Sequence, residues 1–125
     1  MAYTHEIIER EGYLQVTSAG KMDAYDGMLE YAKSILAALD SSGRKAVLLD
    51  HRSLNFKMFS LDAVDIAAWL DEQNIQSMGL RAAALPAKGD LLISKFFETV
   101  FVNRSLNLKV FSNEDAAVVW LRDRG

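Results

Sequence analysis

Hydrophobic and polar positions alternate at the start of the chain and then change to a helical spacing. Residues Tyr3–Arg10 and Tyr13–Ala19 form two short runs that favour β-strands, and Glu11-Gly12 between them is typical of a tight hairpin turn. From Met22 to Leu39 hydrophobic residues recur every three or four positions, which predicts an amphipathic helix that ends at Gly43. The chain is therefore expected to open with an antiparallel hairpin and a helix.

Three further units follow, each with a short apolar run and then a helical pattern. The predicted strands span Lys45–Asp50, Leu80–Ala87 and Leu106–Ser112. The predicted helices span about Ser60–Gln73, Asp90–Arg104 and residues 114–124, and Ser60 and Asn113 are expected to cap the first and the last of them.

The element order ββαβαβαβα predicts the fold class. Strands that alternate with helices form parallel sheets with right-handed crossovers, and the opening hairpin adds one antiparallel strand at the edge. We expect an α/β fold with a mostly parallel sheet, Lys45–Asp50 at its centre, and helices packed on it. With 125 residues and no linker or low-complexity segment, a single domain over residues 1–125 is predicted.

Composition and charge narrow the function classes. The net charge of -3 and the scattered lysines and arginines argue against binding to nucleic acid or to an anionic membrane surface. The chain contains no cysteine, which excludes disulfides, thiolate catalysis and cysteine-ligated metals. Glutamates occupy the amino terminus where a signal peptide has its apolar run, and no apolar run reaches membrane-spanning length, so a cytoplasmic protein is expected.

Two segments resemble a known family. The run VLLDHRSLNF ends an apolar strand in Asp50 and continues to Leu54 and Phe56, and LKVFSNEDAAVVWL joins a strand through Phe111 to a helix with Trp120-Leu121. Together with the element order, these segments resemble the STAS domains, in particular the SpoIIAA-like branch of small stand-alone bacterial proteins. The resemblance spans nearly the whole chain and implies a non-catalytic regulatory module.

The phosphorylation motif of this family is absent from the matching position of this chain. The resemblance implies Asp-Ser-Ser-Gly at the start of the second helix, where this chain reads Met58-Phe59-Ser60-Leu61. The letters DSSG do occur at Asp40–Gly43, but there they are predicted to end the first helix, with Gly43 in the left-handed conformation. A module without the usual phosphoserine switch is therefore expected.

Candidate binding residues lie where the parallel strands end. Ligands in open α/β sheets collect beyond the carboxyl ends of the strands, next to helix amino termini that attract anions. The candidates for a ligand or partner site are Asp50, Arg52, Phe56, Met58, Phe59, Ser60, Lys88 and Asp90. For the polar members the alternative is structural, because an aspartate after a strand commonly accepts backbone hydrogen bonds and a serine at a helix start commonly caps it.

No catalytic or metal-binding set is evident in the sequence. His5 and His51 are the only histidines, neither has a second ligand at helical spacing, and a surface position is predicted for His51. Asp50 and His51 are adjacent on an extended strand and are expected to point to opposite sides. A nucleophile, a base and an orienting group cannot be named together, so we assign no catalytic residue, cofactor or metal, and leave the question of an enzyme open.

Two predicted helices carry more apolar side chains than one buried face can hold. The excess is expected either to be buried deeply or to meet a partner or a second copy of the chain. The candidate interface residues are Ile66, Trp69, Leu70, Phe97 and Phe101.

The leading hypothesis is a STAS-like module that docks a protein partner or itself. The alternative is a small binding protein for an apolar or anionic metabolite, with Phe56, Met58 and Phe59 among its walls.

Overall fold

The computed structural model describes residues 3–123, and all five of its strands lie in one sheet of order β1-β2-β3-β4-β5. The strands are β1 Tyr3–Arg10, β2 Tyr13–Met22, β3 Ala46–Phe56, β4 Arg81–Pro86 and β5 Leu108–Val110. The helices are α1 Tyr25–Ser42, α2 Ser60–Glu72, the 3₁₀ turn η1 Ile75–Met78, α3 Leu91–Asn103 and α4 Glu114–Arg122. This is the predicted order, with η1 as an unpredicted addition.

The sheet topology confirms the predicted mixture of strand directions. β1 pairs antiparallel with β2, and Arg10 faces Tyr13 across the two-residue turn at Glu11-Gly12, where Gly12 has a φ of 86°. The pairs β2·β3, β3·β4 and β4·β5 are parallel. β3 is therefore central, and Asp50 lies opposite Leu85, so the two strands end on the same edge of the sheet.

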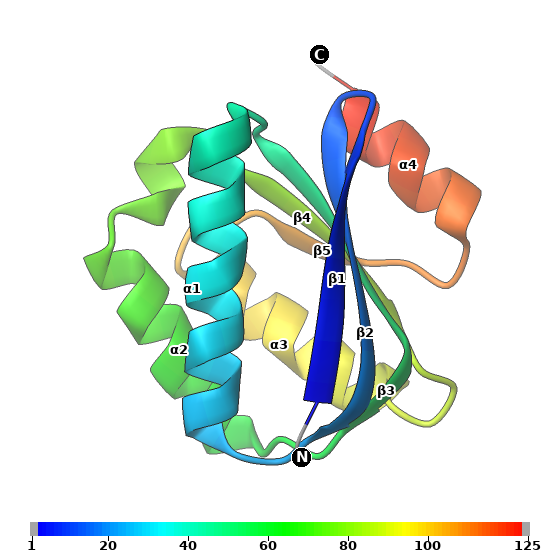
Figure 1. The fold of residues 1–125 in the computed structure, drawn as a ribbon. Coiled ribbons are helices and arrows are strands. Elements are labelled where there is room, and N and C mark those ends of the chain that lie inside the picture. Colours follow the sequence, from blue (N-terminus) through cyan, green and yellow to red (C-terminus); the bar gives the residue numbers. More distant parts are fainter. Residues whose placement is uncertain (1–2, 124–125) are drawn as a thin grey trace.

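Helices cover the two faces of the sheet unequally (Figure 1). One face carries α1, α2 and α3, and the larger core cluster lies beneath them with Leu14, Val16 and Leu54 almost fully buried. The other face carries α4 alone, over a smaller cluster that includes Leu48 and Leu121. The part of this second face near β1 is left open to solvent.

β3 is longer than the sequence predicted and contains a bulge. Thr17 pairs with Asp50 and Ala19 with Ser53, so β3 has one residue more than β2 between these pairs. The extra residue reverses the alternation, and Leu54 therefore joins the core beneath the three helices. Residues Arg52 to Phe56, which follow the predicted end of the strand at Asp50, are thus part of it.

The structure confirms some of the predicted helix ends and corrects others. Gly43 closes α1 in the left-handed conformation with a φ of 71°, which confirms that Asp40–Gly43 is a helix terminus. The Asn113 side chain caps α4 by accepting from the Ala116 N–H at 2.9 Å. Ser60 is the first residue of α2 rather than its cap, and the Asp62 carboxylate accepts from the N–H of Phe59 at 2.8 Å. The predicted last helix extended to Arg124, which lies outside the described residues.

Candidate functional site

The eight predicted binding residues occupy three different places. Asp50 and Arg52 lie on the face of the sheet that carries α4. Phe56 and Met58 are buried in the large core cluster, with 8% and 6% of their surface exposed. The remaining four, at the edge of the sheet where β3 and β4 end, are Phe59, Ser60, Lys88 and Asp90.

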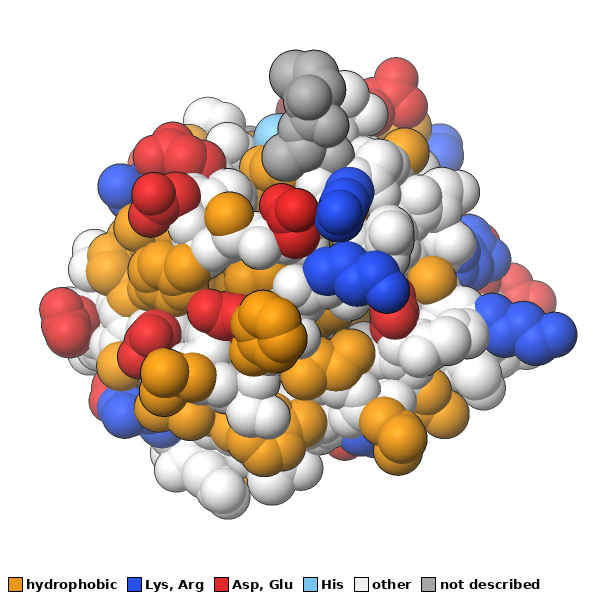
Figure 2. All heavy atoms as spheres, turned by 90° about the horizontal axis from the view of Figure 1, so that it is seen from below, with side chains coloured by type: hydrophobic (Ala, Val, Ile, Leu, Met, Phe, Trp, Pro, Cys, Tyr) orange, Lys and Arg blue, Asp and Glu red, His pale blue; other side chains and the backbone are white. Residues whose placement is uncertain are grey.

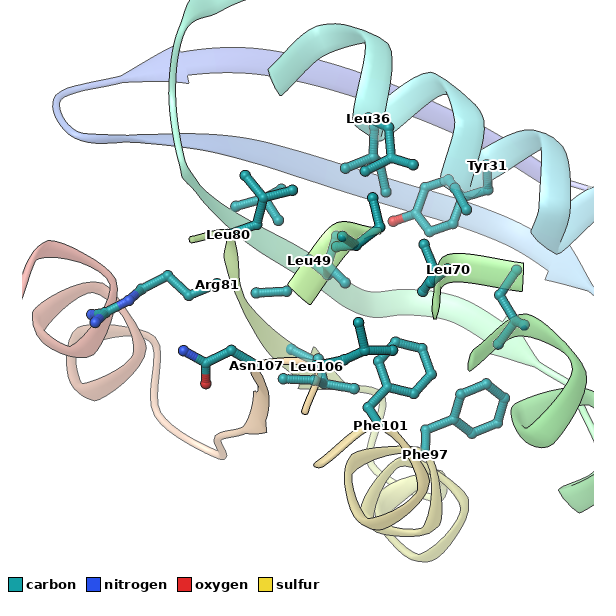
Figure 3. A pocket seen from close by; sticks show the side chains of 18 of the residues that line it. Tyr31, Leu36, Leu49, Leu70, Leu80, Arg81, Phe97, Phe101, Leu106 and Asn107 are labelled. Carbon is teal, nitrogen blue, oxygen red and sulfur yellow. The ribbon is translucent and has the colours of Figure 1, made fainter. Parts of the chain in front are cut away.

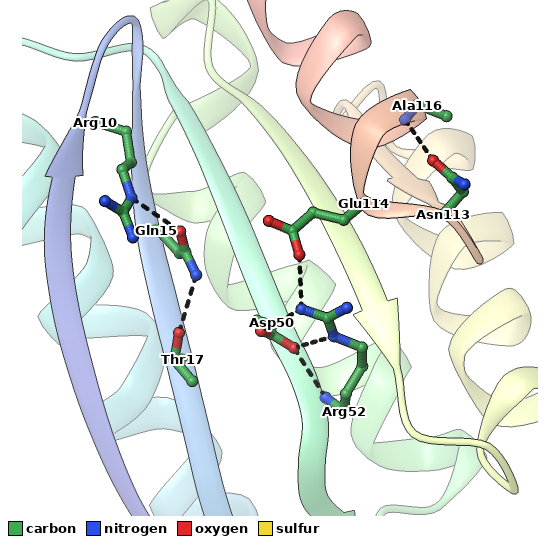
Figure 4. A network of polar contacts seen from close by, with 8 residues as sticks. All are labelled: Arg10, Gln15, Thr17, Asp50, Arg52, Asn113, Glu114 and Ala116. Carbon is green, nitrogen blue, oxygen red and sulfur yellow. Dashed lines mark hydrogen bonds and ion pairs between the residues drawn. The ribbon is translucent and has the colours of Figure 1, made fainter.

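Asp50 and Arg52 form an ion pair that extends to α4 (Figure 4). The Arg52 guanidinium donates from Nε and Nη2 to the two Asp50 carboxylate oxygens, each at 2.8 Å, and from Nη2 to Glu114 Oε1 at 2.8 Å. The Arg52 N–H also donates to Asp50 Oδ1 at 3.2 Å, inside the bulge. These bonds hold the pKa of the Asp50 carboxyl below its ordinary value, despite its burial.

This arrangement fits a structural role for Asp50 better than a catalytic one. A general base needs a carboxylate that is free to take a proton, whereas both Asp50 oxygens already accept from Arg52. Among residues 3–123, no group of three or more acidic, histidine or cysteine side chains is placed to hold a metal ion.

His51 is partly buried and lines the larger face of the sheet, whereas the sequence predicted a surface position. Its ring stacks on Phe56 at 5.9 Å between centroids, and its Nε2 lies 2.8 Å from the hydroxyl oxygen of Tyr31. Ser18 Oγ donates to the same Tyr31 oxygen at 3.0 Å, which leaves the Tyr31 hydroxyl proton available for the imidazole nitrogen. Burial lowers the pKa of His51 to about 4, and burial raises the pKa of Tyr31 far above its usual range.

The edge where the parallel strands end carries exposed apolar side chains. Phe59 is 73% exposed and Leu61 68% exposed at the start of α2, and Leu92 is 87% exposed at the start of α3. Asp90 links the start of α3 to the end of β3, because its Oδ2 accepts from the N–H of Phe56 at 3.4 Å. Figure 2, which views this end of the molecule, shows hydrophobic side chains gathered across its middle and lower part. We call Phe59, Leu61, Leu91, Leu92 and Phe96 the apolar rim.

The predicted interface residues are more buried than the apolar rim. Ile66 and Phe97 belong to the core, and Trp69, Leu70 and Phe101 are partly buried against it. α2 and α3 do carry exposed apolar side chains, but these are other residues than the predicted ones. Most of them lie near the amino ends of the two helices, and Val102, 55% exposed near the end of α3, is an exception. Periodicity could not show this, because it gives the face of a helix and not the part of its length that a neighbour covers.

Comparisons with known proteins support the fold. No family model matches the chain, and no curated protein matches it either. The crystal structure of an anti-sigma factor antagonist from Mycobacterium paratuberculosis is similar over 98% of this chain and 96% of that chain, with a TM-score of 0.60 and 20% sequence identity. The two chains share one fold. The STAS-like fold that the sequence predicted is thereby confirmed.

One further observation concerns membranes. Among the described residues, no helix combines the length and the apolar character that crossing a bilayer requires.

Proposed function

We propose that this chain is a cytoplasmic, non-catalytic regulatory module that docks a protein partner or a second copy of itself through the apolar rim. The observation that carries the proposal is the exposure of Leu92, Phe59 and Leu61, at 87%, 73% and 68%, on one end of the molecule. Soluble proteins rarely leave contiguous large apolar side chains in water unless they form an interaction surface.

The shared fold supports a regulatory role. The similar structure is that of a protein named as an antagonist of an anti-sigma factor, hence as one that acts on another protein. Docking through the rim needs no phosphoserine switch, which agrees with Met58-Phe59-Ser60-Leu61 in place of the family motif. Ser60 is exposed beside Phe59, where it contributes to the surface without capping the helix.

Substitutions on the rim test this function. Phe59→Asp and Leu92→Asp each place a charge where docking would bury an apolar side chain, and we expect each to weaken binding at least about tenfold. Val119→Asp is the matched control, because Val119 is 71% exposed but lies on α4, over the other face of the sheet.

The measurements are sedimentation velocity for self-association and quantitative affinity recovery for a partner. We expect one species, either the dimer or a single partner, to be lost in both rim variants and kept in Val119→Asp. A wild-type protein that is monomeric at all concentrations and recovers no partner contradicts the proposal. So does a complex that the rim variants retain.

A second candidate function, small-molecule binding, is favoured by a different observation. A cavity of about 180 Å³ lies between the sheet and the three helices on its larger face. Phe56 and Phe97 line it, whereas Met58 belongs to the neighbouring core.

A further inference from the structure

The cavity is large enough for a small organic molecule. It lies between β3, β4 and β5 on one side and α1, α2 and α3 on the other, and its volume is about 180 Å³. For comparison, an engineered apolar cavity of about 150 Å³ in another protein stays dry and binds benzene. A molecule built around one ring therefore matches this space.

The walls of the cavity are almost entirely apolar (Figure 3). Leu36 comes from α1, Leu49 from β3, Leu70 from α2, and Phe97 and Phe101 from α3. Close-packed interiors rarely contain voids much larger than a water molecule. A void of this size, lined by leucine and phenylalanine, is therefore a feature that a ligand would stabilise.

The cavity opens at the end of the sheet opposite the apolar rim. A second hollow adjoins it and shares five of its lining residues, which are Ile75, Leu80, Arg81, Leu106 and Asn107. These residues belong to η1, the start of β4 and the connection between α3 and β5. The mouth thus lies at the amino ends of β4 and β5, whereas the sequence directed attention to the carboxyl ends.

η1 is the least firmly packed side of this mouth. None of its four residues is buried, and it lies between two residues in the left-handed conformation, Asn74 with a φ of 60° and Gly79 with a φ of 71°. Segments with little buried surface open at low cost in free energy. Outward movement of η1 therefore gives a ligand the easiest path into the cavity.

Polar groups mark the inner part of the cavity. The hydroxyl of Tyr31 and the ring of His51 line it and are bonded to each other at 2.8 Å. Ser94 also lines it with only 8% of its surface exposed, and among the described residues its hydroxyl has no hydrogen-bond partner. Among the described residues no fully buried side-chain polar atom lacks a partner, so the Ser94 hydroxyl keeps some access to water. A ligand with one polar group would replace that water and bond to the hydroxyl directly.

The cavity offers no charge for an anion. Among the described residues that line it, Arg81 alone is cationic. Arg81 donates from Nη1 to the carbonyl oxygens of Trp120 and Asp123, and its guanidinium lies over the Trp120 ring at 5.1 Å. Figure 3 shows this side chain extending toward α4 and away from the cavity. Neutral ligands are therefore favoured over anionic ones.

We propose that this cavity binds a small, uncharged, largely apolar molecule of about one ring that carries one hydroxyl or carbonyl group next to Ser94. The ligand enters between η1 and the connection from α3 to β5. The proposal rests on the second candidate function and names its ligand class and entrance. It does not depend on docking at the apolar rim.

Three probes of similar size test the ligand class by titration calorimetry: toluene, p-cresol and benzoate. Toluene and p-cresol should bind, and benzoate should bind at least about tenfold more weakly than p-cresol because its charge would lose water without gaining a partner. If toluene and p-cresol do not bind up to their solubility limits, or if benzoate binds best, the proposal is wrong.

Two variants locate the site. Ser94→Ala should weaken p-cresol binding about five- to tenfold and leave toluene binding unchanged, since only p-cresol can bond to the hydroxyl. Ala82→Leu fills part of the cavity from β4 and should reduce binding of both probes. Ser34→Ala is the matched control, because Ser34 lies on α1, outside the cavity lining, and bonds to the Glu30 carbonyl oxygen.

Equal effects of Ser94→Ala on both probes, or unchanged binding in a folded Ala82→Leu variant, would overturn the assignment. If Ala82→Leu does not fold, the Ser94→Ala comparison alone decides. The outcome is separable from docking, because Phe59→Asp lies outside the cavity lining and should abolish docking while it leaves toluene binding intact.

Discussion

Asp50 and His51 are neighbours in β3, yet they lie in opposite environments. Asp50 faces the side that α4 covers only in part, and the half-exposed guanidinium of Arg52 holds the pKa of its carboxyl low. His51 faces the side beneath α1, α2 and α3, where burial lowers the pKa of the ring and Tyr31 supplies its hydrogen bond. The two pKa shifts have the same direction and different causes.

This contrast separates two ways of stabilising a sheet face. The larger face depends on buried apolar area and on neutral hydrogen bonds that water cannot replace. The smaller face depends on a contact with α4 and on ion pairs that water and salt can weaken. The cavity lies on the larger face and the apolar rim at its end, so the features available for binding belong to the better-covered side.

The largest loss of stability is expected from a substitution in the core of the larger face. Leu54→Ala removes a side chain that is 1% exposed, just after the bulge in β3. We expect it to lower the free energy of unfolding by about 3 to 5 kcal/mol. Urea denaturation measures this, with Val119→Ala on α4 as the exposed control, expected to change stability by less than about 0.5 kcal/mol. A small loss for Leu54→Ala would mean that this face is loosely packed.

The next largest effect is the dependence of stability on pH that His51 causes. Its pKa is about 4 in the folded chain and 6.5 for an ordinary histidine, so the unfolded state binds a proton first as the pH falls. The stabilisation from neutral His51 is complete above pH 6.5 and is lost progressively down to pH 4, by about 2 to 3 kcal/mol in total. Denaturation between these pH values should show this slope, and His51→Leu should remove it. An unchanged slope in the variant would assign it to another group.

A smaller effect is expected when the ion pair is broken on the other face. Arg52→Met leaves the Asp50 carboxylate, whose side chain is 10% exposed, without its bidentate partner. Stability should fall by about 1 to 2 kcal/mol at pH 7, because Arg52 itself is half exposed. The pKa of Asp50 should rise, and NMR titration of its carboxyl carbon measures this directly. No rise would show that Arg52 is not the cause of the low pKa.

The smallest effect is expected at the outer end of the same network. Glu114→Gln keeps an acceptor for Arg52 and removes a charge from a pair whose side chains are 50% and 40% exposed. We expect a loss of at most about 0.5 kcal/mol, abolished in 1 M salt. A loss as large as that of Arg52→Met would mean that α4 is held to the sheet mainly by this ion pair.

The sequence predicted the order and direction of the elements because each strand and helix is locally consistent in its hydrophobic period. It did not predict the bulge in β3, because the polar residues from Asp50 to Ser53 look like the end of a strand. They continue the strand in the structure, since the partly open α4 face leaves Arg52 half exposed while it pairs with the buried Asp50 carboxylate.

The candidate site was predicted in outline only. The burial of His51 depends on Tyr31, which is 20 residues away, and no local pattern reports such a contact. The cavity is also invisible to sequence analysis, because it arises from how three helices and the sheet fit together. Its mouth at the amino ends of β4 and β5 departs from the general tendency of such sheets to bind ligands at the carboxyl ends.

Docking through the apolar rim is the central claim, and one binding isotherm tests it most directly. The affinity of wild-type chain for its recovered partner, or for a second copy, should fall at least about tenfold in Leu92→Asp and stay within about twofold in Val119→Asp. Equal affinities in all three proteins, or a greater loss in Val119→Asp, would contradict the claim and move the interaction surface to α4.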